Sequence, residues 1–255
     1  MENTEVVVEK NSRQCGIGLC RLTACQKFAD IRIFLAVMCV AGGIQAAFAG
    51  YSASLNTTLE KRFSIGSFLI GTINACFEIG YIIAAINVTH FAAKAHVPRC
   101  LSFGFLIISF GAFLVAFLHF IMPSTEPTSM LSNYSSNTKY IVFLYLGQFC
   151  IGVGSSPILT LAPTFIDSHV HSSKSPPMIA ALYSTSALGP VFGFALGTVA
   201  LNLHENLIDN HSGLKPHDAR WIGAWWFGYF FLGAFLTICA FIMFSFPLRL
   251  RTETG

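Results

Sequence analysis

Glu78 is the residue with the clearest chemical potential, because it is the one acidic residue in a long apolar stretch. Between Arg62 and Lys94 there is no other Asp, Glu, Lys or Arg. A carboxylate facing lipid costs at least a few kcal/mol, so we expect Glu78 to point into the bundle, toward a water-filled cavity or a hydrogen-bonding partner. It would then serve proton coupling or line a substrate path. The alternative is a structural acid held by hydrogen bonds from neighbouring helices. On a helical period, Glu78 shares a small and polar face with Ser67, Gly71, Asn74, Tyr81 and Ala85.

His119 is a second titratable group, near the outer end of another apolar stretch. A histidine at such a position can respond to pH near neutrality. A lone histidine is, however, more often a structural polar residue than a ligand. We therefore keep both interpretations and predict that the ring faces a vestibule.

The sequence gives no support to enzymatic or metal chemistry. It contains neither a Walker loop nor a Gly-x-Ser-x-Gly elbow, and His169 and His171 have no helical His box beside them. Cys15, Cys20 and Cys25 are evenly spaced, but structural zinc usually takes four ligands in closer pairs. We expect reduced thiols, no cofactor, no metal and no enzymatic activity.

The elements that carry these residues are predicted to be membrane-spanning helices. Charged residues make up 11% of the chain, hydrophobic residues 54%, and the mean hydropathy is +0.63; a soluble domain has about 25% charged residues. A net charge of +3 without a basic run argues against nucleic acid. Charge-poor stretches exceed the ~20 residues that cross a bilayer. They predict an all-α integral membrane protein with six helices near residues 33–55, 65–87, 100–121, 140–165, 178–201 and 221–246.

The distribution of basic residues predicts both termini in the cytosol. With that orientation five of the fifteen Lys and Arg fall outside and the rest inside. The chain then divides into a cytosolic tail (1–32), a six-helix transmembrane bundle (33–246) and a cytosolic end (247–255). Among the sequons, Asn133 and Asn210 fall in outside loops and are the predicted glycosylation sites.

Glycines predict how one helix packs. Gly189, Gly193 and Gly197 recur every four residues, which leaves a groove where another backbone can approach. Pro190 is expected to bend the same helix. Such a bend suits a transporter that rocks, but helix packing alone would also select these residues.

A Trp-rich segment at residues 218–228, Asp-Ala-Arg-Trp-Ile-Gly-Ala-Trp-Trp-Phe-Gly, stands at the outer edge of the sixth predicted helix. Physically it is an interfacial anchor, with Arg at the headgroups and aromatic rings in the belt. It closely resembles the signature of the organic anion transporting polypeptide family. Further similarities occur at Thr57–Phe63, Phe77–Gly80, His119–Phe120, Phe165–Asp167 and Leu188–Gly197.

The resemblance implies the major facilitator fold and sodium-independent exchange of amphipathic organic anions. The implied substrates are bile salts, steroid conjugates, thyroid hormones and prostanoids, and the implied location is the plasma membrane. Members have twelve spans, so the chain resembles an N-terminal half, with the C-terminal half or a full-length relative as its partner in the bilayer. Ser168 and Leu118 depart from the family pattern and bear on the inside gate and the substrate set.

Two sets of residues are predicted to serve transport. The substrate path is assigned to Gln45, Asn74, Glu78, His119 and Gln148, and the outer rim to Asp218, Arg220, Trp221, Gly223, Trp225 and Trp226. The one charge in the spans is negative, so the preference for anions rests on the resemblance. The alternative hypothesis is a truncated membrane protein that does not transport but modulates a full-length relative through its glycine face.

Overall fold

The computed structural model describes residues 30–91, 96–122, 134–204 and 221–246. Within these ranges the chain forms six long helices and no named strand, and each helix is long and apolar enough to cross a membrane. The prediction of an all-α, six-helix membrane protein is thereby confirmed. The helices are α3 (Ile31–Phe63), α4 (Ser67–Phe91), α5 (Val97–Ile121), α6 (Tyr134–His169), α7 (Ser175–Asn202) and α8 (Trp225–Phe244).

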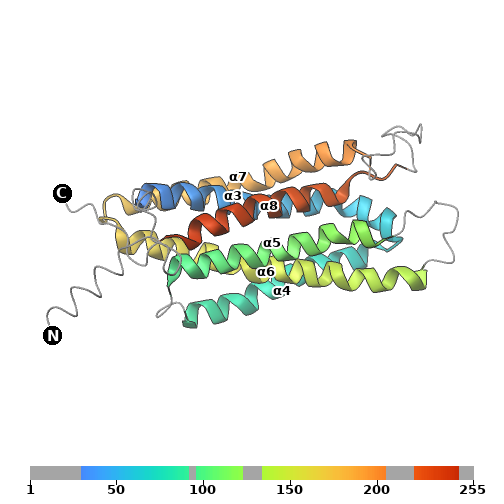
Figure 1. Ribbon diagram of the computed structural model, residues 1–255, viewed down its shortest axis with the longest axis horizontal. Coiled ribbons are helices and arrows are strands. Elements are labelled where there is room, and N and C mark those ends of the chain that lie inside the picture. The colour runs from blue at the N-terminus through green and yellow to red at the C-terminus, as the bar shows by residue number, and fades with distance from the viewer. Residues whose placement is uncertain (1–29, 92–95, 123–133, 205–220, 247–255) are drawn as a thin grey trace.

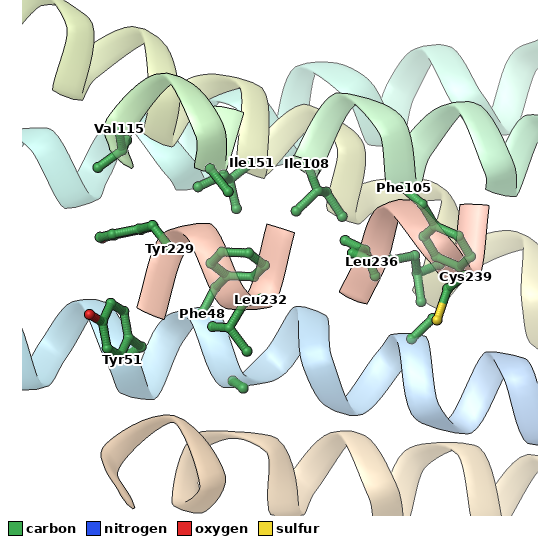
Figure 2. Packing of buried hydrophobic residues seen from close by; sticks show 14 of the residues in the cluster. Phe48, Tyr51, Phe105, Ile108, Val115, Ile151, Tyr229, Leu232, Leu236 and Cys239 are labelled. Atoms are coloured by element: carbon green, nitrogen blue, oxygen red, sulfur yellow. The ribbon is translucent and has the colours of Figure 1, made fainter. Parts of the chain in front are cut away.

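The helices lie side by side in an elongated bundle (Figure 1), and α3 begins at the end of the bundle where α8 finishes. We call the opposite end, where α3 passes into α4, the outer end. The main pairs are α3 with α7, α4 with α6, and α5 with both α6 and α8. Figure 2 shows α8 between α3 on one side and α5 and α6 on the other, with α7 beyond α3.

Several helix ends differ from the predicted spans. The first helix continues to Phe63, past the predicted residue 55, because Leu55, Leu59 and Phe63 keep one face buried. Ser64 then ends it in a left-handed conformation, with its N–H bonded to the carbonyl of Glu60. Hydropathy reports where the chain crosses lipid, whereas helical hydrogen bonding continues into polar residues. The same reason accounts for the greater length of α6.

Glycines set the closest helix contacts in the described structure. A Cβ atom on Gly193 would overlap the carbonyl oxygen of Ala47, and one on Gly197 would overlap the hydroxyl of Ser54. From the other side, a Cβ on Gly50 would overlap the carbonyl of Pro190. The glycine face of α7 is therefore filled by α3 of the same chain. The helix itself continues without interruption through Pro190.

Some predicted features lie outside the described residues. These are the glycosylation sites Asn133 and Asn210, the rim residues Asp218 and Arg220, and most of both terminal ranges. The five described cysteines are free: Cys39, Cys76, Cys100, Cys150 and Cys239.

Candidate functional site

Four polar side chains from three helices form a hydrogen-bonded line, which we call the polar row: Ser52 and Asn56 of α3, Asn74 of α4 and Gln148 of α6. The Ser52 hydroxyl donates to the side-chain oxygen of Asn74 at 3.3 Å. The Asn74 amide donates to the side-chain oxygen of Asn56, also at 3.3 Å. Gln148 donates to the Ser52 hydroxyl at 3.3 Å. Two of the predicted path residues, Asn74 and Gln148, are thus brought together through a serine.

The row extends to α8 through Tyr229. The Gln148 amide nitrogen donates to the Tyr229 hydroxyl at 3.1 Å, and both side chains are buried. Gln148 can reach across because its neighbour Gly147 packs directly on the backbone of α5 at Gly111. Because Gly147 faces α5, the side chain of the next residue, Gln148, turns toward α3 and α8.

The geometry of the row suits exchange of hydrogen bonds with a ligand. All four bonds join side chain to side chain, at 3.1–3.3 Å, so a ligand can take the place of a partner without breaking a backbone hydrogen bond. Ser52, Asn56 and Asn74 are only partly buried. Amides and hydroxyls both donate and accept, so the row can bind the oxygen atoms of a polar group without carrying a formal charge.

Glu78 lies one turn along α4 from Asn74 and is exposed within the described bundle. The rotation of α4 places it there, because the face of α4 that packs against α6 is set by Gly80 and by Phe77 over Gly152. Glu78 is left on the exposed side of α4, at the open edge of the row, one turn from Asn74. The assignment of Glu78 to a path stays a prediction.

The two remaining predicted path residues lie apart from the row. Gln45 is 9% exposed on α3 and precedes Ser52 by two turns, about 10 Å along the axis. His119 packs against α8, its ring stacked on Trp226 with centroids 4.8 Å apart and planes at 14°. The structure thus groups His119 with the Trp-rich segment and not with Asn74 and Gln148.

The described part of the Trp-rich segment joins three helices at the outer end. The Trp221 indole donates to the carbonyl of Leu201 in the last turn of α7, at 2.8 Å. Trp225 is fully buried and meets Phe63 edge-on at 5.8 Å. The assignment of this ring to the outer rim stays a prediction, but its burial shows that it packs among the helices. The signal in the sequence for the burial of Trp225 was its helical spacing from three other apolar residues. One buried face of α8 is formed by Trp225, Tyr229, Leu232 and Leu236.

Tyr51 was not singled out from the sequence, yet its side chain is the centre of the contact between α3 and the start of α8. Its hydroxyl donates to the Trp225 carbonyl at 2.8 Å and accepts the Gly228 N–H at 2.9 Å. We call Tyr51, Trp225 and Gly228 the outer junction. Figure 2 shows Tyr51 on α3 and Tyr229 on α8 close by. Ser52, Asn56 and Tyr229 were also missed, and the seven-residue spacing of Gln45 and Ser52 was the signal that could have indicated a polar face on α3.

Comparison with known proteins matches the sequence of this chain to one family. Residues 33–255 match the Organic Anion Transporter Polypeptide (OATP) family. Solute carrier organic anion transporter family member 1A4 of Rattus norvegicus is 28% identical over 257 residues, which cover 89% of this chain and 39% of that protein. Member 74D of Drosophila melanogaster is 28% identical over 295 residues, 95% of this chain and 36% of that protein.

Member 2B1 of Mus musculus is likewise 28% identical over 260 residues, covering 89% of this chain and 38% of its own length. The chain therefore spans less than two fifths of these relatives. The family consists of transporters, not enzymes. With the match extending from the first described helix through the last, the chain belongs to the organic anion transporter polypeptide family.

Proposed function

We propose that this chain forms one wall of a path that carries amphipathic organic anions across a membrane without sodium. Bile salts, steroid conjugates, thyroid hormones and prostanoids are the proposed substrates. The proposed setting is the plasma membrane, with both termini in the cytosol. The observation that carries the proposal is the polar row, a line of partly buried, exchangeable hydrogen bonds within an otherwise apolar bundle.

The charge pattern of the path supports hydrogen bonding over ion pairing as the means of holding the anion. The central parts of the six charge-poor stretches contain no Lys or Arg, and their one charged residue is Glu78. A carboxylate repels an anion. The amide N–H groups of Asn74 and Gln148 can instead donate to sulfate or carboxylate oxygens, and hydrogen bonds to charged groups contribute about 1.5–3 kcal/mol each.

An uptake experiment on the chain by itself tests the proposal. The protein would be reconstituted into vesicles, with the amount inserted measured for each preparation, and labelled taurocholate uptake followed against concentration. We expect saturable uptake that does not require sodium. Asn74→Leu and Gln148→Leu together should reduce it at equal inserted amounts. Linear, unsaturable uptake that matches protein-free vesicles would contradict the proposal.

The modulator hypothesis predicted that the glycine face of α7 pairs with a relative. In the structure α3 already occupies that face at Gly189, Gly193 and Gly197. A modulator would therefore need another surface. Absence of uptake together with co-purification of a full-length relative would favour this second function.

A further inference from the structure

The Tyr51 hydroxyl caps α8 from a different helix. It is fully buried, donates to the Trp225 carbonyl and accepts the N–H of Gly228. Both backbone groups belong to the first turn of α8, the part of a helix where N–H groups lack intrahelical acceptors. By accepting the Gly228 N–H, a side chain of α3 takes the part that a capping residue next to the helix usually takes, and its bond to the Trp225 carbonyl adds a second contact to the same turn.

The ring of Tyr51 also fixes how closely the two helices approach. A Cβ atom on Gly228 would overlap the ring, so the ring lies directly on the backbone of α8. On its other edge the ring meets Tyr229 in a T-shaped contact, with centroids 5.2 Å apart. The first turn of α8 is consequently held in both distance and rotation relative to α3.

The contacts of Tyr51 with α8 connect to the polar row through Tyr229. Tyr229 follows Gly228, and its hydroxyl accepts the amide of Gln148. The same amide donates to Ser52, the residue after Tyr51. A closed ring of contacts therefore runs from α3 to α8, on to α6 and back to α3.

We propose that Tyr51 is a positioning residue for the polar row: by capping the first turn of α8 it places Tyr229, and through Tyr229 it places the Gln148 amide. The inference rests on the proposed function, since the row is the part of the path that meets the substrate. It goes beyond that function because Tyr51 itself faces no ligand. A residue that only stabilised the fold would change the amount of inserted protein and leave the row unchanged.

Tyr51→Phe is the direct test, because it keeps the ring and removes both hydrogen bonds. At equal inserted amounts we expect the KM for taurocholate uptake to rise roughly three- to tenfold. A change of this size corresponds to weakened hydrogen bonds between the Gln148 amide and the substrate. Tyr183→Phe is the matched control, since Tyr183 is exposed on α7, and its KM should stay at the wild-type value. In a Tyr229→Phe background, Tyr51→Phe should change the KM by less than about 1.5-fold, because residues that act as a unit are not additive.

An unchanged KM for Tyr51→Phe, with only less protein inserted, would overturn the positioning role. So would effects of Tyr51→Phe and Tyr229→Phe that simply multiply. If the wild-type chain shows no uptake, the proposed function fails, and thermal unfolding in detergent decides about Tyr51 alone. The combined fall in Tm of Tyr51→Phe and Gln148→Met should then be smaller than the sum of the single falls by at least about 2 °C. Additive falls would overturn the inference.

Discussion

Tyr51 and Ser52 are neighbours on α3, but they belong to two regions of opposite character. Tyr51 is fully buried in the outer junction, with hydrogen bonds of 2.8 and 2.9 Å to the backbone of α8. Ser52 is partly exposed in the polar row, with side-chain hydrogen bonds of 3.3 Å. The junction uses backbone groups, which have fixed positions, whereas the row uses amides and hydroxyls that can turn.

The difference separates what makes the sequence recognisable from what can act on a ligand. Trp221, Trp225 and Gly228 are the conspicuous residues, and the structure uses them to join α8 to its neighbours. The chemistry available to a substrate comes from inconspicuous residues such as Ser52 and Asn74. Variants in each region therefore test how far the contacts that join the helices influence the groups that can meet a substrate.

Gly228→Ala should produce the largest effect on stability. The added Cβ would overlap the Tyr51 ring, and overpacking of this kind costs about 1–3 kcal/mol. Gly71→Ala is the matched control, because nothing lies within 4 Å of a Cβ at that position of α4. There we expect unchanged or slightly higher stability, since alanine favours helix. Thermal unfolding in detergent measures both; equal behaviour of the two variants would contradict the tight junction.

Ser52→Ala should affect transport instead of stability. It removes the acceptor of Gln148 and the donor to Asn74, while Gln148 keeps its bond to Tyr229. We expect the KM for anion uptake to rise roughly two- to tenfold, the equivalent of one modest hydrogen bond. Ser184→Ala, on the exposed side of α7, serves as the control. An unchanged KM with a lowered Tm would instead assign Ser52 to the structure.

Trp221→Phe is expected to cost about 1 kcal/mol of unfolding free energy, because the Leu201 carbonyl loses its indole donor while the aromatic ring remains. The effect should appear as a lower Tm without any change in KM. Trp226→Phe keeps an aromatic ring against His119 and provides a comparison within the same segment. A change in KM for Trp221→Phe would show that the contact between Trp221 and α7 also influences the path.

The number and kind of helices could be predicted because charge-poor stretches report the solvent directly. The ends could not, as α3 shows: its Leu59 and Phe63 extend the buried face beyond the apolar stretch. Asn74 and Gln148 could be singled out as polar groups in apolar surroundings. That Ser52 links them could not be predicted, because a serine in a helix most often bonds its own backbone. The rotation of each helix decides such contacts.

Rotation also explains why Glu78 and His119 lie apart from the hydrogen bonds of the row, although the sequence grouped them with Asn74 and Gln148. One face of α4 was correctly identified as polar, but glycine contacts with α6 decide which neighbour that face meets. For His119, order along the chain could not show that α5 would bring its ring onto Trp226. Single glycines set close contacts between helices that are far apart in the sequence. The periodicity of residues within one helix does not predict such contacts.

Glu78→Gln should give the smallest effect and probes the open edge of the row. The side chain keeps its shape, but the negative charge beside Asn74 is removed. Because a carboxylate repels an anion, we expect the KM for taurocholate to fall by roughly two- to fivefold near neutral pH, under 1 kcal/mol in free energy.

Asp30→Asn removes the same charge at the start of α3, far from the row, and is the matched control, because asparagine also caps a helix well. If both substitutions shift uptake equally, the effect is one of overall charge and not of position. If neither does, Glu78 takes no part in the path, and the polar row must hold the anion without any influence from the one carboxylate that lies beside it.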